Sequence, residues 1–191
     1  MAKNIDEYLL VAKELISKNF KNKPIITMIT NGVLLEKRKL QNLGFLDWIH
    51  ISVHSHRKEN FEKIERKAKF ETLVAGIKDI RSRYNDLNIH IEFVANKENK
   101  NDVEGFIPWA FNELKVDSLN VRRVSTSSYA PRSYLEQSLK DNISIDISDE
   151  EWSEIRHKVS KSWPSDLSTT PSFNSEEQIL KKQATTEVIE L

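Results

Sequence analysis

The sequence contains two histidines, His54 and His56, that are separated by a single residue, Ser55. If one strand carries both, their imidazoles lie on one face about 6.6 Å apart, at ~3.3 Å per residue. Glu92 or His90 from a neighbouring strand would complete a hydrolase-type zinc site. Arg57 and Lys58 follow the two histidines at once and oppose a bound cation electrostatically. We therefore expect no metal site and keep a metal-dependent barrel hydrolase as an alternative.

None of the 191 residues is a cysteine. Disulfides, thiolate zinc sites, cysteine nucleophiles and iron–sulfur clusters held by the chain's own thiolates are therefore excluded. Glycine is also scarce, with four residues, and no GxGxxG or GxxxxGK[ST] loop is present. Any nucleotide-binding function must rest on other residues.

Charged side chains balance to a formal net charge of +0. This balance favours neither nucleic acid nor an anionic membrane as a partner. The mixed charges of 57–69 are typical of a solvated helix face. The sequence contains no apolar run long enough to span a membrane and no apolar signal-peptide core at its start. We expect a cytoplasmic protein.

Polar side chains recur at every second position in three short segments. This is the period of a β-strand, whose successive side chains point to opposite faces. In 47–54, Ile49 and Ile51 lie on one face and His50 and Ser52 on the other. The segments 88–95 and 116–124 repeat the pattern, with polar residues that include His90, Glu92, Asn120 and Arg122.

A further strand is expected at 25–29. Between the expected strands, apolar residues recur at the spacing of an α-helix. The predicted helices cover 5–19, 33–43 with Gly44 as its end, 70–84, and a segment from the N-cap Asp102 to Leu114. Alternating strands and helices are typical of parallel βαβ units. In an open doubly wound sheet helices would bury both faces, at a cost for unpaired polar groups.

A polar face therefore predicts an α/β fold: a partial (β/α) barrel of about four parallel strands, helices outside, with a polar C-terminal tail. The alternative is a two-layer antiparallel sheet with its polar face in water. We expect the barrel to cover 1–124 and an extension, partly helical and partly disordered, to cover 125–191. In that extension Ser148 and Glu151 predict a capping box that opens a helix, and 164–175 are expected to be poorly ordered.

Four stretches resemble, in order and spacing, successive strand ends of radical S-adenosylmethionine (radical SAM) enzymes. They are 25–32 with its Thr-Asn-Gly turn, 47–55, 89–101 and 118–124. In that family the turn ends the third barrel strand, and an Ile-Ser-Val-His-like segment ends the fourth. The resemblance covers about two-thirds of the chain.

The resemblance implies a cofactor-binding role for polar residues at these strand ends, where barrel active sites gather. Ser52 would donate a hydrogen bond to a carboxylate or ribose hydroxyl, and Arg122 would pair with a carboxylate. The resemblance implies no catalytic residue. The implied cofactor-binding residues are Thr30, Asn31, Gly32, Ser52, His54, Glu92, Asn96 and Arg122.

Two departures from the family bear on activity. The Cys-x3-Cys-x2-Cys segment that holds the family's four-iron iron–sulfur cluster is missing, and so is the Gly-Gly-Glu-Pro-like segment. We expect a truncated or split radical SAM-like protein that is inactive alone. S-adenosylmethionine is its implied cofactor, and its partner a chain carrying the missing N-terminal barrel segment. A non-catalytic binding protein derived from the fold is the other alternative, and the substrate stays open.

Overall fold

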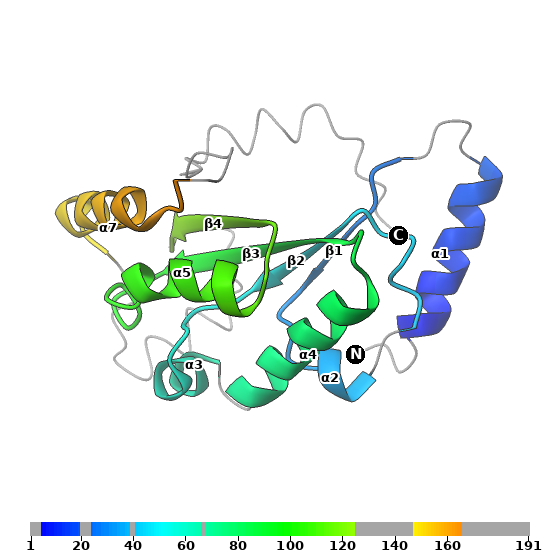
Figure 1. Ribbon diagram of the computed structural model, residues 1–191, viewed down its shortest axis with the longest axis horizontal. Helices are drawn as coiled ribbons and strands as arrows, with labels where there is room; N and C mark the ends of the chain where they lie inside the picture. The colour runs from blue at the N-terminus through cyan, green and yellow to red at the C-terminus, as the bar shows by residue number, and fades with distance from the viewer. Residues whose placement is uncertain (1–4, 20–23, 39–40, 66–67, 125–146, 166–191) are drawn as a thin grey trace.

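One parallel sheet forms the centre of the molecule. The computed structural model describes residues 5–19, 24–38, 41–65, 68–124 and 147–165. Its strands lie side by side in chain order, as Figure 1 shows. They are β1 (Thr27–Thr30), β2 (Trp48–Ser52), β3 (Asn88–Ala95) and β4 (Ser118–Arg123). The predicted parallel α/β architecture is confirmed, and the antiparallel alternative is wrong.

The register of the strands aligns apolar residues with one another across β2, β3 and β4. Ile51 lies between Thr30 and Ile91, and Ile91 in turn faces Leu119. Ile51, Ile91 and Leu119 are buried, as are their apolar neighbours along the same strands. Because side chains alternate in a strand, the residues between them form a second, polar face.

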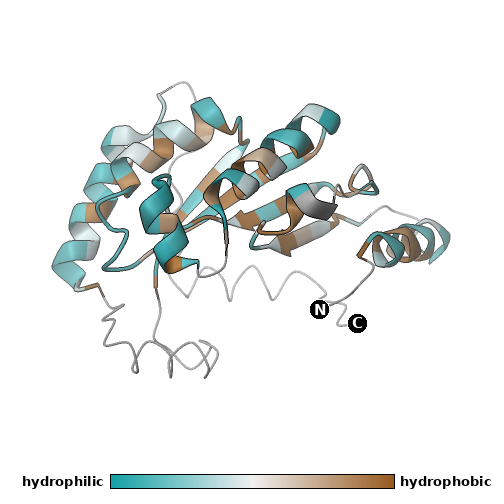
Figure 2. Cartoon of the chain, turned by 90° about the horizontal axis from the view of Figure 1, so that it is seen from below, coloured by the Kyte–Doolittle hydropathy of each residue, from teal (hydrophilic) through white to brown (hydrophobic). Residues whose placement is uncertain are grey.

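Helices cover the apolar face and leave the sheet open rather than closed into a barrel. Figure 2 shows α4 and α5 on the same side of the sheet, with hydrophobic residues turned towards it. The helices are α1 (Ile5–Asn19), α2 (Leu35–Arg38), α3 (Lys58–Ile64), α4 (Phe70–Arg83), α5 (Val103–Glu113) and α7 (Asp149–Ser162). No helix in the described ranges is long and apolar enough to cross a membrane.

The helix predicted over 33–43 is much shorter than expected, and Gly44 does not end it. α2 ends at Arg38, and within 41–46 Leu43 and Leu46 both enter the core, with Leu46 N–H donating to the Leu43 carbonyl at 3.0 Å. Residues 41–46 are not helical, and both leucines are buried there. Tertiary packing therefore overrides the helical pattern of this segment.

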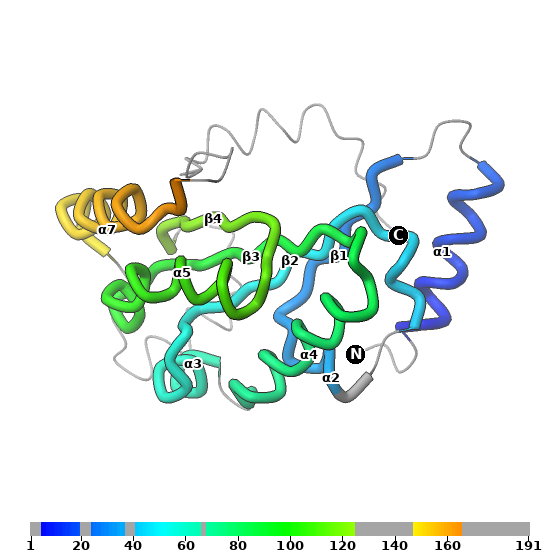
Figure 3. The backbone as a smooth tube through the Cα atoms, in the orientation of Figure 1, coloured from blue at the N-terminus to red at the C-terminus, as the bar shows by residue number. Residues whose placement is uncertain are grey.

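The extension after β4 contributes to the same core. The predicted capping box of α7 is confirmed: Glu151 N–H donates to Ser148 Oγ and Ser148 N–H donates to Glu151 Oε2. Ile155 and Val159 are buried in the core cluster. The tube in Figure 3 places α7 beside α5, with α1 at the opposite end of the molecule. The boundary at 124 stays a prediction, and most of 164–175 lies outside the described residues.

Candidate functional site

Two rows of polar side chains cross the face of the sheet that α4 and α5 leave open. The register aligns His50 with His90 and His90 with Ser118. One step towards the carboxyl ends, it aligns Ser52 with Glu92 and Glu92 with Asn120. Sequence alternation predicted this face, but only the register shows which residues are neighbours.

The first row is a pair of imidazole rings in contact, of which His90 is hydrogen-bonded to Ser118. The His50 and His90 rings lie 4.5 Å apart between centroids, and His90 Nδ1 lies 2.7 Å from Ser118 Oγ. Burial, with a smaller effect from His50, lowers the pKa of His90 to about 4. Burial also lowers the pKa of His50, although the Glu92 carboxylate opposes that shift. Both rings are therefore neutral near pH 7.

The second row offers both hydrogen-bond donors and acceptors. Arg122 Nε forms an ion pair with Glu92 Oε1, and this nitrogen is buried without a hydrogen-bond partner among the described residues. Asn120 is 6% exposed, and its Oδ1 is buried without a hydrogen-bond partner. Asn120 is not among the cofactor-binding residues predicted from the sequence. The available signal was its position two residues before Arg122, which places both on the same face of the strand.

The Thr-Asn-Gly segment forms a tight turn at the carboxyl end of β1. Thr30 Oγ1 accepts a hydrogen bond from Gly32 N–H at 3.1 Å, and Asn31 Oδ1 accepts one from Val33 N–H at 3.4 Å. Gly32 has a φ of +72°, which favours glycine. These three predicted site residues therefore shape the backbone here, and Asn31 also projects an exposed side chain.

Asn96 lies at the carboxyl end of β3 and stabilises the loop that follows. Its Oδ1 accepts hydrogen bonds from Glu98 N–H at 2.8 Å and Asn99 N–H at 3.2 Å. Asn99 Nδ2 donates to the carbonyls of His54 at 2.8 Å and Val94 at 3.0 Å. Asn99, which we did not predict, thereby ties the ends of β2 and β3 together.

The two histidines that suggested zinc lie in different surroundings. His54 Nε2 lies 3.0 Å from Glu65 Oε1, next to α3. His56 packs against Phe106 and Trp109 on α5, and burial is the main cause that lowers its pKa. Within the described part of the chain no three His, Asp or Glu residues are grouped to hold a metal ion.

Asp102 precedes α5 as predicted, but its side chain does not cap that helix. It is buried and accepts hydrogen bonds from Ser55 Oγ at 2.5 Å, Asn60 Nδ2 at 2.9 Å and Arg57. Three donors from the loop after β2 and from α3 compensate its burial. Asp102 therefore joins the loops that follow β2 and β3.

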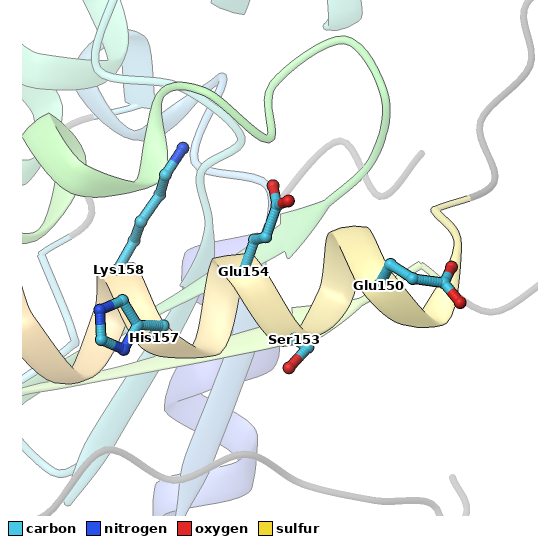
Figure 4. Close-up of a pocket in the computed structure, with 5 residues that line it drawn as sticks. All are labelled: Glu150, Ser153, Glu154, His157 and Lys158. Atoms are coloured by element: carbon cyan, nitrogen blue, oxygen red, sulfur yellow. The ribbon is translucent and has the colours of Figure 1, made fainter.

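A pocket at the surface of α7 has no connection to the polar rows. Figure 4 shows its lining residues, which all belong to one helix: Glu150, Ser153, Glu154, His157 and Lys158. Residues of a single exposed helix face do not converge on a ligand from several sides, so the candidate site remains the polar face of the sheet.

The fold and site define a class: a parallel (β/α) sheet of the barrel type, with polar side chains along its open face and at its strand ends. Residues 1–110 match the family model for the radical SAM superfamily. The chain belongs to this superfamily, as the resemblance of its strand ends predicted.

The aligned relatives are much longer than the matching region. Over 88 residues, the chain is 32% identical to a probable GTP 3',8-cyclase of Saccharolobus islandicus, covering 46% of this chain and 28% of the relative. Over 99 residues, it is 33% identical to a probable GTP 3',8-cyclase of Sulfurisphaera tokodaii, covering 50% and 30%. The alignment thus spans less than a third of these curated relatives.

A solved structure supports the fold over most of the chain. It is a domain of pyruvate-formate lyase-activating enzyme from Bacteroides vulgatus ATCC 8482, with a TM-score of 0.58 and 7% sequence identity. The superposition covers 92% of this chain and 96% of that one. At this identity the likeness shows the fold alone.

Proposed function

We propose that this chain provides the S-adenosylmethionine-binding side of a radical SAM site, and that another polypeptide holds the iron–sulfur cluster. The observation that carries the proposal is the second polar row, in which Ser52, Glu92 and Asn120 come from three adjacent strands with Arg122 one step further along β4. Membership of the superfamily identifies S-adenosylmethionine as the ligand to test.

The chemistry of this row fits the amino-acid end of the cofactor. Arg122 and the Ser52 hydroxyl are donors for a carboxylate, while Glu92 and Asn120 Oδ1 are acceptors for an ammonium group. A buried acceptor without a donor is costly, and a ligand N–H placed against Asn120 removes that cost. Bound S-adenosylmethionine supplies the sulfonium bond whose reductive cleavage begins the family's chemistry, and these residues bind and orient it.

The cluster does not fit this chain. Iron–sulfur clusters of this type are held by cysteine thiolates, and the sequence contains none. We therefore derive no catalytic step through a cluster on this chain. The proposed partner carries the Cys-x3-Cys-x2-Cys segment and completes the sheet beyond β1.

Binding of S-adenosylmethionine can be measured on the isotope-labelled chain by NMR. We expect weak binding, with a Kd on the order of 1 mM, and amide shifts at Ser52, Asn120 and Arg122. Arg122→Gln should weaken binding at least ~10-fold, because a charged hydrogen bond is lost. The matched control is Arg123→Gln: Arg123 contacts Asp149 and the Ile147 carbonyl instead.

Two results would contradict this part of the proposal: no shifts at these amides up to about 10 mM ligand, or equal weakening by both arginine variants. Anaerobic incubation with iron and sulfide tests the other part. The chain alone should develop no cluster absorbance, and a stoichiometric four-iron cluster on it would overturn the requirement for a partner.

A non-catalytic binding protein is the second candidate, and the exposed hydrophobic residues near β1 favour it. The two functions differ in the partner they need. A reading frame next to this one that encodes the cysteine motif, and whose product forms a cluster-bearing complex with this chain, would support the split enzyme. A complex in which S-adenosylmethionine remains uncleaved under reducing conditions would support the binding protein.

A further inference from the structure

Exposed hydrophobic residues gather in one region of the molecule. Within the described ranges, the large hydrophobic side chains that are exposed all belong to α1, to β1 or to the segment that enters β1: Tyr8, Leu10, Val11, Leu15, Ile25 and Ile29. On α1, Tyr8, Val11 and Leu15 form one stripe at helical spacing, beside the packed side that carries Leu9. The apolar arc of α1 is therefore only partly covered.

The backbone of β1 is also open on one side. β2 is its only neighbour among the described strands. Trp48 N–H donates to the Ile26 carbonyl, and hydrogen bonds alternate along a parallel strand, so Ile26 and Met28 face β2. Ile25, Thr27 and Ile29 consequently direct their amide and carbonyl groups outwards. Such an edge is a template for another strand.

The residues along this edge are complementary to a second copy of themselves. The segment Ile-Ile-Thr-Met-Ile, 25–29, has nearly the same pattern in both directions about Thr27. No charged residue occurs in 24–30, whereas edge strands that avoid association usually carry charges. Ile25 and Ile29 are 78% and 76% exposed, so apolar side chains are available on both sides of Thr27.

We propose that β1 pairs in antiparallel orientation with β1 of a second copy of this chain, about a two-fold axis at Thr27. Ile25 then lies opposite the partner's Ile29, and Thr27 opposite the partner's Thr27. The outward backbone groups of both copies become paired, and one sheet runs through the dimer. An isologous contact of this kind closes on itself and does not propagate into fibres.

This inference goes beyond the proposed function and uses the edge at which a cluster-bearing partner would bind. The homodimer and that complex are therefore mutually exclusive. Because the polar rows lie on β2 to β4, S-adenosylmethionine binding does not require the dimer. The two proposals fail independently of one another.

Sedimentation of the full chain from about 1 µM to about 500 µM tests the dimer. We expect a reversible monomer–dimer equilibrium, with slower hydrogen exchange at the Thr27 and Ile29 amides as concentration rises. Ile29→Lys should raise the dimer Kd at least ~10-fold, because a charge enters the contact twice. The matched control is Leu10→Lys, which adds the same charge at an exposed leucine on the other side of α1 and should leave Kd unchanged.

Three results would overturn the proposal. The first is a chain that stays monomeric at the highest concentration. The second is a dimer with the same Kd in the Ile29→Lys variant, whose fold is checked by circular dichroism. The third is a dimer lost when 166–191 are removed but retained in Ile29→Lys, which would assign the contact to that segment.

Discussion

Asp102 is buried and His90 is partly buried, and their polar groups are compensated in different ways. Asp102 accepts hydrogen bonds from three donors that belong to the loop after β2 and to α3. His90 is hydrogen-bonded to Ser118, and burial favours its neutral form. The Asp102 network is structural, whereas the His90 ring lies beside the row that we propose to bind a ligand.

The lowered pKa of His90 makes the stability of the protein depend on pH. Its pKa is about 4 in the folded protein against 6.5 unfolded, so protonation favours the unfolded chain. The stability from neutral His90 is complete above pH 6.5 and is lost as the pH falls towards 4. The loss amounts to about 3 kcal/mol. The free energy of unfolding, measured with denaturant at several pH values, should therefore depend less steeply on pH in His90→Asn than in the wild type.

His157 provides the control for this measurement, because it is exposed on α7. His157→Asn should leave the pH slope unchanged. Equal slopes in wild type and His90→Asn between pH 6.5 and 4 would show that burial of this ring does not control its protonation.

At the scale of elements, the turn after β1 depends on one glycine. Gly32 adopts a φ of +72°, and a Cβ there would collide with Leu73 Cδ1 and approach Ile51 Cγ2 to 2.9 Å. Ile51 belongs to β2 and Leu73 to α4, so this turn is where strand, turn and helix meet. Sequence indicated a turn at this glycine but not its close packing.

Gly32→Ala should lower the free energy of unfolding by about 2–4 kcal/mol, because both strain and overpacking are introduced. Gly44→Ala is the matched control: its Cβ would lie 3.5 Å from the Tyr84 ring, an ordinary contact, and its φ is not in the left-handed region. We expect a change within about 1 kcal/mol there. Chemical denaturation measures both, and equal effects would contradict the role assigned to Gly32.

For the whole molecule, the question is whether α7 folds together with the sheet. Ile155 and Val159 share a core cluster with residues of α5 and β4. α7 is therefore packed as part of the core, although the sequence predicted an extension that starts at residue 125.

Substituting Ile155 and Val159 together by alanine should lower the stability of the entire chain by about 3–6 kcal/mol, since two buried aliphatic side chains are truncated. Hydrogen exchange should then become faster in β3 and β4 as well as in α7. The control is Ser160→Ala on the exposed side of α7. Unchanged protection of β3 and β4 in the double variant would show that α7 is a separate unit.

The sequence by itself determined the parallel α/β architecture and the polar face, because alternation within strands and periodicity within helices are local properties of the chain. Long periodic elements such as α1, α4 and β3 were predicted nearly to the residue. The absence of cysteine likewise determined that these 191 residues hold no iron–sulfur cluster through thiolates of their own.

Only the tertiary structure decided which polar residues meet. Strand register placed Asn120 beside Glu92. Packing of the loops against the helices placed His54 beside Glu65, His56 against Trp109, and the Asp102 carboxylate beside Ser55. The helix after β1 is shorter than its apolar pattern predicted, and Leu43 and Leu46 are buried in the non-helical segment that follows. These outcomes depend on contacts between residues far apart in the chain, which periodicity does not encode.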